Sequence, residues 1–178
     1  WDLDDNHLSS HIHPLKVKVK KPKTKGSKAD SVEKVTVEQL LPELENTTFH
    51  MIFKIAICDD DLQNIKEIET QLITYEMKYN IDFEISMFYR GSDLLAQYQS
   101  PGSFHILFLD VEMPELNGLA IAEQIRNLPD RKAKIVFVSN YPEYMKDSFN
   151  VQAFHYLSKP FTADKCFDIL RRIIKDFE

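Results

Sequence analysis

The sequence has few cysteines and no long apolar run, and both absences narrow the class of protein. Its 178 residues include two cysteines, Cys58 and Cys166, which lie far apart and outside any CxxC or Cys/His cluster. This usage indicates reduced, buried, cytosolic thiols rather than a disulfide framework or a zinc site. No apolar run approaches the roughly 18 residues of a membrane-spanning helix, and the N-terminus lacks a signal-peptide pattern. We therefore expect neither membrane insertion nor secretion.

An excess of basic charge, typical of nucleic-acid binding, is also lacking. Residues 1–50 balance eight lysines against eight carboxylates, whereas residues 51–178 hold fourteen Lys and Arg against twenty Asp and Glu. The net charge of -6 therefore belongs entirely to residues 51–178. Because an acidic surface repels nucleic acid, we expect no direct nucleic-acid contact from this part of the chain.

Residues 1–50 differ in composition from the rest. Seven lysines lie within residues 16–28, a pattern typical of an extended, solvated segment and less often of a binding arm. A short helix is possible at residues 36–46, although Pro42 weakens it. Met51 is typical of a native start, so residues 1–50 are either a leader or appended sequence or a natural extension that docks on a partner. The expected domain is residues 51–178.

Two kinds of apolar pattern alternate from Met51 onward. Short runs rich in β-branched and aromatic residues predict five strands, at residues 52–58, 83–88, 104–109, 135–138 and 153–157. Apolar residues at helical spacing predict five helices, at residues 62–79, 92–99, 119–127, 143–149 and 163–177. Continuous apolar strands separated by helices indicate an α/β fold with a doubly wound, five-stranded parallel sheet, the flavodoxin-like (βα)5 arrangement.

Polar residues stand at the carboxyl ends of four predicted strands. They are Asp59, Asp60 and Asp61 after the first strand, Asp110 after the third, Ser139 after the fourth and Lys159 after the fifth. In doubly wound sheets the ligand site lies outside the carboxyl ends of the strands. The fold would therefore bring together residues that span a hundred positions of sequence.

These residue types suit phosphoryl transfer. Clustered carboxylates repel one another unless a cation lies between them, and hard oxygen ligands without imidazole or thiolate favour Mg²⁺. Lys159 adds a mobile positive charge and Ser139 a hydroxyl donor, so Asp110 is arranged to attack phosphorus. Taken singly, such residues usually cap helices or form turns. Their expected convergence at one edge favours chemistry and predicts an aspartyl phosphate.

The motifs around these residues resemble the receiver domains of two-component response regulators. The resemblance runs from residue 52 to about residue 177. Its specific stretches are Ile57-Cys58-Asp59-Asp60-Asp61, Leu107 to Pro114 with Asn117-Gly118, Val136-Phe137-Val138-Ser139-Asn140, and Tyr156-Leu157-Ser158-Lys159-Pro160-Phe161. In this order and spacing they are highly specific.

The resemblance implies a role for each site residue. Asp110 would be the phosphoacceptor, and the Mg²⁺ ligands would be Asp59, Asp60, Asp110 and the backbone carbonyl of Glu112. Ser139 would be the switch hydroxyl and Lys159 the phosphate-pairing lysine, joined to Pro160 by a cis peptide bond. Tyr156 would be the aromatic switch that turns inward on activation, unless it is simply a half-buried packing tyrosine. Asp61 has only a supporting role.

The resemblance also implies partners and an output. A sensor histidine kinase would supply the phosphoryl group to this cytoplasmic, non-enzymatic phosphoacceptor. The face of the fourth helix, fifth strand and fifth helix would then change shape, with Tyr141, Tyr144 and Phe149 available for homodimer formation. Residues 139–144 and 151–157 are similar to receivers joined to LytTR-type DNA-binding domains. Since no such domain follows Glu178, we expect a piece of a longer transcriptional regulator or a free-standing receiver.

Three alternatives remain open from the sequence. Phosphatases of the haloacid dehalogenase type use an aspartate nucleophile in an Asp-x-Asp motif, which Asp59-x-Asp61 formally matches. A flavin-binding domain of the same fold would need a phosphate loop after the first strand, where these aspartates would repel the FMN phosphate. A degenerate receiver would act only as a protein-binding module, although every expected active-site residue is present.

Overall fold

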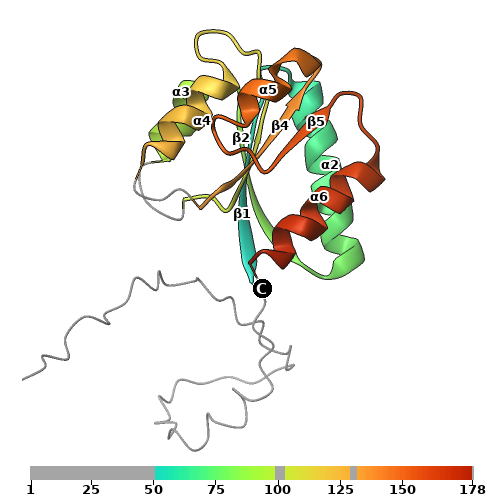
Figure 1. Ribbon diagram of the computed structural model, residues 1–178. Helices are drawn as coiled ribbons and strands as arrows, with labels where there is room; N and C mark the ends of the chain where they lie inside the picture. Colours follow the sequence, from blue (N-terminus) through green and yellow to red (C-terminus); the bar gives the residue numbers. More distant parts are fainter. Residues whose placement is uncertain (1–50, 99–102, 129–131, 178) are drawn as a thin grey trace, which may run out of the picture. The chain divides into compact units, whose positions relative to one another are not determined.

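A computed structural model of the chain describes residues 51–98, 103–128 and 132–177. Within these residues five parallel strands form one sheet in the order β2-β1-β3-β4-β5 (Figure 1). The strands are β1 (Ile52–Cys58), β2 (Asp82–Phe88), β3 (Ile106–Leu109), β4 (Lys134–Ser139) and β5 (His155–Ser158). This is the doubly wound α/β fold that the alternating pattern predicts. The predictions for residues 1–50, including the helix at 36–46, lie outside the described residues.

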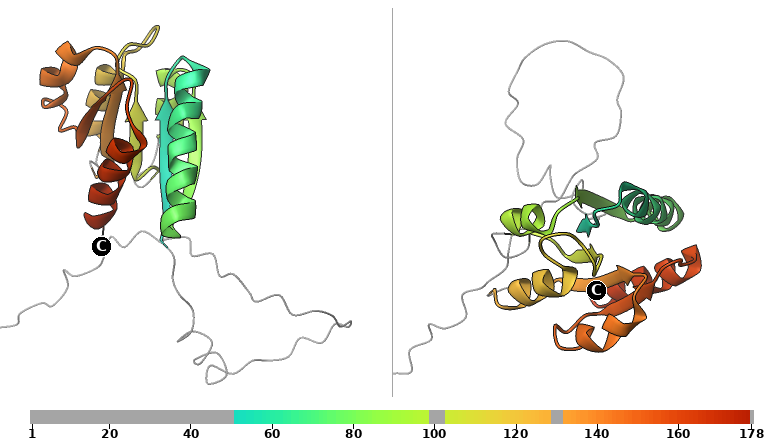
Figure 2. Two further views of the ribbon diagram at one scale, coloured as in Figure 1. Left: turned by 90° about the vertical axis from the view of Figure 1, so that its right-hand side faces the viewer. Right: turned by 90° about the horizontal axis from the view of Figure 1, so that it is seen from above.

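Helices cover both faces of the sheet. They are α2 (Leu62–Tyr79), α3 (Gly91–Gln97), α4 (Gly118–Arg126), the 3₁₀ helix η1 (Pro142–Tyr144), α5 (Met145–Ser148) and α6 (Ala163–Lys175). Figure 1 shows α2 and α6 on one face and α3, α4 and α5 on the other. Turned by 90°, α2 and α6 stand together in front of the sheet (Figure 2). The sheet is thus the middle layer of three, as its apolar strands require.

Alternation along each strand divides the core between the two faces. All four residues of β3 are buried, and β1 is buried from Ile55 to Cys58. Ala56, Cys58, Leu107 and Leu109 belong to the cluster on the side of α3 and α4, which also holds Leu94 and Ile121. Their neighbours Ile55, Ile57, Ile106 and Phe108 point the other way, towards α2 and α6, because successive side chains of a strand face opposite sides.

Polar side chains start three of the helices next to the carboxyl edge of the sheet. Asp61 accepts the backbone N–H of Gln63 over 2.8 Å at the start of α2, and Asn117 accepts that of Ala120 over 2.8 Å at the start of α4. Thr162 caps α6 in the same way. Such caps satisfy N–H groups that have no partner inside the helix. Each helix therefore begins close to the end of the strand that precedes it.

Several element boundaries differ from the predictions. The third strand begins at Ile106 rather than residue 104, because the Phe104 ring packs on Phe88 and Tyr98 as part of the loop. The fifth strand begins at His155 rather than residue 153, after a turn in which Gln152 has a φ of 51°. The predicted helix at 143–149 is a 3₁₀ turn followed by one short α-helix.

The described helices also bear on membrane insertion. Among residues 51–98, 103–128 and 132–177, no helix is both long enough and apolar enough to cross a bilayer. The longest, α2, has 18 residues and carries charged side chains on its exposed side.

Candidate functional site

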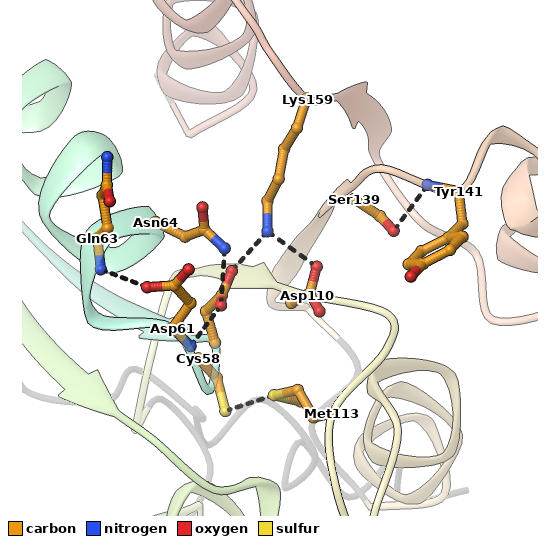
Figure 3. A network of polar contacts seen from close by, with 10 residues as sticks. Cys58, Asp61, Gln63, Asn64, Asp110, Met113, Ser139, Tyr141 and Lys159 are labelled. Carbon is orange, nitrogen blue, oxygen red and sulfur yellow. Dashed lines mark hydrogen bonds and ion pairs between the residues drawn. The ribbon is translucent and has the colours of Figure 1, made fainter.

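The ammonium of Lys159 joins two buried carboxylates at the carboxyl edge of the sheet. Its Nζ lies 2.7 Å from Oδ2 of Asp59 and 3.0 Å from Oδ1 of Asp110 (Figure 3). Asp59 follows β1, Asp110 follows β3 and Lys159 follows β5, so three separate strands supply the group. Asp59 is 1% exposed and Asp110 is 7% exposed. Their negative charges therefore lie where solvent screens them little, and a cation between them is required.

The loop after β1 orients the Asp59 carboxylate. Oδ1 of Asp59 accepts the backbone N–H of Asp61 over 2.9 Å and the side-chain amide of Asn64 over 3.1 Å. Its other oxygen, Oδ2, faces Lys159. The side chain of Asp61 caps α2 instead of binding Lys159.

Asp60 completes a cluster of three carboxylates that could hold a cation. One carboxylate oxygen from each of Asp59, Asp60 and Asp110 lies within 4.8 Å of the others. Asp60 is exposed while its two neighbours are buried, so the cluster opens to solvent on one side. All three ligands are hard oxygens, the donor set that Mg²⁺ prefers. These residues can hold Mg²⁺, and the chemistry of their donors fits the predicted ion.

The pKa values of Asp110 and Lys159 are both raised, but for different reasons. Burial raises the pKa of Asp110 to about 6, although the positive charge of Lys159 opposes the rise. Burial disfavours the Lys159 ammonium, but hydrogen bonding to Asp59 and the negative charges of Asp110 and Asp59 outweigh it, so its pKa is raised. Lys159 therefore remains charged at neutral pH, and a further cation near Asp110 would favour its carboxylate form.

Gly118 is required by the close approach of α4 to the backbone of Asp110. A Cβ at position 118 would lie 2.1 Å from the carbonyl oxygen of Asp110 and 3.2 Å from Cα of Val111. The Gly118 N–H donates to the carbonyl of Val111 over 2.9 Å. The Asn117-Gly118 pair thus starts the helix and leaves room for the backbone that carries Asp110.

A chain of contacts links Ser139 to Tyr156. Oγ of Ser139, at the end of β4, accepts the backbone N–H of Tyr141 over 3.2 Å (Figure 3). The carbonyl of Tyr141 accepts the hydroxyl of Tyr156. Tyr156 is 9% exposed, and the centroid of its ring lies 6.2 Å from that of the Phe137 ring. Both predicted switch residues therefore bind the same segment, the loop that follows β4.

The side chain of Glu112 contacts a residue from another segment of the chain. The hydroxyl of Tyr144, in η1, donates to Oε1 of Glu112 over 3.0 Å. The two residues line a cavity of about 410 Å³ together with Val111, Met113, Pro114 and Asn117.

The peptide bond between Lys159 and Pro160 is cis.

The sequence reasoning missed three contacts of the site. Asn64 binds Asp59, and the buried thiol of Cys58 approaches the Met113 sulfur at 3.7 Å (Figure 3). The third contact is the hydrogen bond from the Tyr144 hydroxyl to Glu112. Asn64 lies one turn inside α2, where helical spacing from the cap could have indicated it. The other two contacts join residues from separate loops, and no local pattern could have found them.

A family model for the response regulator receiver domain matches residues 55–171, about two thirds of the chain. Among curated proteins, the sensory transduction protein LytT of Oceanobacillus iheyensis is 37% identical over 86 residues, which are 48% of this chain and 35% of that protein. The protein MrkE of Klebsiella pneumoniae is 26% identical over 125 residues, which are 70% of this chain and 44% of that protein. The chain thus spans less than half the length of these two relatives.

Solved structures agree with the fold. The crystal structure of the response regulatory domain of mrkE from Klebsiella pneumoniae matches with a TM-score of 0.61 and 25% identity, covering 69% of this chain and 96% of that one. A structure described as the BeF3-activated DrrB receiver domain matches with a TM-score of 0.60 and 24% identity, covering 70% of this chain and 99% of that one.

Proposed function

Because the chain belongs to the receiver-domain family of two-component response regulators, we propose that Asp110 accepts a phosphoryl group from a sensor histidine kinase. The observation that carries the proposal is the Lys159 ammonium, 3.0 Å from Asp110 and 2.7 Å from Asp59, at a cluster of three carboxylates. A nucleophilic carboxylate next to a fixed cation is what phosphoryl transfer needs, since negative charge accumulates on the transferring oxygens.

In the proposed step, a carboxylate oxygen of Asp110 attacks phosphorus in line while the phosphorus–nitrogen bond of the kinase phosphohistidine breaks. The imidazole leaves with the bonding electron pair and takes a proton from solvent, giving neutral histidine and an aspartyl phosphate. Lys159 then pairs with an oxygen of the new phosphoryl group. The products are a modified Asp110 and a free kinase histidine, so the chain is a phosphoacceptor rather than an enzyme with turnover.

Asp59, Asp60, Asp110 and the backbone carbonyl of Glu112 are the proposed ligands of Mg²⁺. The ion would supply positive charge for the carboxylates and for phosphoryl oxygens. The hard-oxygen donor set of the three aspartates supports this assignment. Asp59 is oriented for such a role because Asn64 and the Asp61 N–H hold one of its oxygens.

Ser139 and Tyr156 are the proposed switch. Ser139 would turn its hydroxyl from the Tyr141 N–H towards the phosphoryl group, which would release the loop after β4. Tyr156 would respond because its hydroxyl binds the Tyr141 carbonyl on the same loop. Phosphorylation would then shift the population between two arrangements of the face formed by η1, α5, β5 and α6.

That face is the proposed surface for a homodimer, and a LytTR-type domain elsewhere in a longer protein is the proposed output, acting on transcription in the cytoplasm. Phe149 is 74% exposed, Met145 41% and Tyr141 39%, which supports a role in association. The 37% identity to the sensory transduction protein LytT over 86 residues supports a role in signalling. Residues 51–178 would form the receiver domain, with residues 1–50 as an extension, leader or appended segment.

Intact mass spectrometry tests the proposal. The protein is incubated with Mg²⁺ and acetyl phosphate, and the expected product carries one added phosphoryl group. Asp110→Asn should lose the product, whereas Asp168→Asn, at an exposed ion pair on α6, should retain it. Without Mg²⁺ the product should be absent. Wild-type labelling in the Asp110→Asn variant would show that Asp110 is not the acceptor.

A further inference from the structure

The hydroxyl of Tyr144, in the segment after β4, binds the carboxylate of Glu112. Glu112 follows Asp110 by two residues on the loop between β3 and α4, whereas Tyr144 belongs to η1. The 3.0 Å hydrogen bond from Tyr144 to Glu112 therefore bridges two loops that both leave the carboxyl edge of the sheet. Tyr141 lies beside this pair, and the Glu112 carboxylate raises the pKa of its hydroxyl. The two rings meet edge to face, with centroids 6.3 Å apart.

This carboxylate lies near a site that is already negative. Asp59, Asp60 and Asp110 bring three carboxylates within 4.8 Å, and Lys159 supplies the cation that contacts two of them. A phosphodonor is itself an anion, so each further negative charge on its approach lowers its local concentration. Glu112 is exposed, lies two residues after Asp110 and has several rotatable bonds, so an unrestrained carboxylate would sample many positions beside this loop.

We infer that Tyr144, with Tyr141 beside it, holds the Glu112 carboxylate away from the approach to Asp110 and so sets the rate at which anionic phosphodonors react. This inference rests on the proposed function of Asp110. Tyr144 is a positioning residue, because it acts through Glu112. Glu112 and Tyr144 both line the cavity of about 410 Å³ described above, and Asp110 is not among its lining residues.

The same loop connects this restraint to the proposed switch. The Tyr141 N–H donates to Ser139, and the Tyr141 carbonyl accepts from Tyr156. Tyr144 lies three residues further along, and its backbone N–H donates to the Tyr141 carbonyl over 3.3 Å. A movement of Ser139 towards a phosphoryl group would therefore disturb the segment that restrains Glu112. Restraint of Glu112 belongs to the unphosphorylated arrangement.

A double-mutant cycle tests the inference. Phosphorylation rates are measured in excess Mg²⁺ for the wild type, Tyr144→Phe, Glu112→Gln and the double variant, because the Gln variant keeps the backbone carbonyl and removes only the charge. Tyr144→Phe should lower the rate of phosphorylation by acetyl phosphate about 3-fold or more. A coupling of this size is usual for residues in contact. In the Glu112→Gln background the same change should alter the rate by less than about 1.5-fold.

Two controls separate positioning from a general structural effect. Tyr79→Phe removes a hydroxyl at the C-terminal end of α2, whose pKa is lowered by Arg171 of α6, and it should leave the rate unchanged. The Tyr144→Phe effect should be smaller with phosphoramidate, which carries less negative charge than acetyl phosphate.

Three results would overturn the inference: an unchanged rate in Tyr144→Phe, an equal slowing in both Glu112 backgrounds, or an equal slowing with both donors. If the wild type accepts no phosphoryl group from either donor, the proposed function itself fails, and the inference fails with it.

Discussion

The Lys159 ammonium lies 2.7 Å from a carboxylate oxygen of Asp59, a residue one hundred positions earlier in the chain. It also contacts Asp110, so one cation serves two buried anions. The site therefore has one carboxylate in excess before Asp60 is counted. Burial raises the pKa of Asp110 to about 6 against the opposing charge of Lys159, and this balance determines how the site responds to substitution.

Lys159→Met should destabilise the metal-free protein by about 3 kcal/mol, because it leaves Asp59 and Asp110 buried without a cation. Added Mg²⁺ should restore part of the loss by supplying positive charge. Urea unfolding in EDTA and in Mg²⁺ measures both effects. Lys134→Met is the matched control, since its partner Asp176 is about half exposed and such a pair is worth no more than about 1 kcal/mol. Equal losses in the two variants would contradict the prediction.

Asp110→Asn should instead increase the unfolding free energy of the metal-free protein, measured in EDTA at neutral pH. The folded-state pKa of Asp110, about 6, lies above its ordinary value, so the folded protein binds this proton more tightly than the unfolded chain does. The unfolding free energy of the wild type therefore falls as the pH rises from about 4 to about 6, and the penalty persists above that range. Asparagine removes the ionisation, and the gain is on the order of 1–3 kcal/mol at pH 7.5.

The pH dependence provides the check on that prediction. The stability difference between Asp110→Asn and the wild type should shrink as the pH is lowered towards 4, where both carry a neutral side chain at position 110. Asp168→Asn, which breaks an exposed ion pair with Arg171, should show no such gain. A constant difference across the pH range would mean that ionisation of Asp110 is not its cause.

Gly118→Ala should be more damaging than Gly91→Ala. The added Cβ at position 118 would lie 2.1 Å from a backbone oxygen of Asp110, which cannot move without shifting β3 or α4. At position 91 the nearest atom, at 2.3 Å, is the terminal methyl of the Ile121 side chain, which can change rotamer. Thermal unfolding should show a loss of about 2 kcal/mol or more for Gly118→Ala and a smaller one for Gly91→Ala. The reverse order would disprove this account of the close approach.

The two cysteine thiols should be unreactive in the folded protein. Burial raises the pKa of Cys58 and of Cys166 to about 12, and both side chains are 0% exposed. Since the thiolate is the reactive species, DTNB should label neither residue at pH 8 until urea unfolds the chain. Both thiols should become reactive at the urea concentration at which circular dichroism shows the midpoint of unfolding. Rapid labelling of one thiol under native conditions would reveal local opening around that strand or helix.

Local patterns were sufficient for the fold and for the polar residues that meet at the carboxyl edge of the sheet. Continuous apolar strands such as 52–58 can only be buried on both faces, so alternation with helices requires a covered parallel sheet. A parallel sheet in turn brings the strand ends with Asp59, Asp110 and Lys159 to one edge. The Asp61 cap and the helix 62–79 follow from contacts within a few residues, and the structure has that helix where the spacing predicts it.

Tertiary structure alone decided which groups touch and how each is charged. Lys159 binds Asp59 as well as Asp110 although β3 and β4 separate β5 from β1 in the sheet, a contact that no local pattern contains. The raised pKa of Asp110 depends on burial, which the whole core creates. The Tyr144–Glu112 bond joins loops thirty-two residues apart, and sequence spacing is uninformative at that range because it depends on how two strand ends happen to face each other.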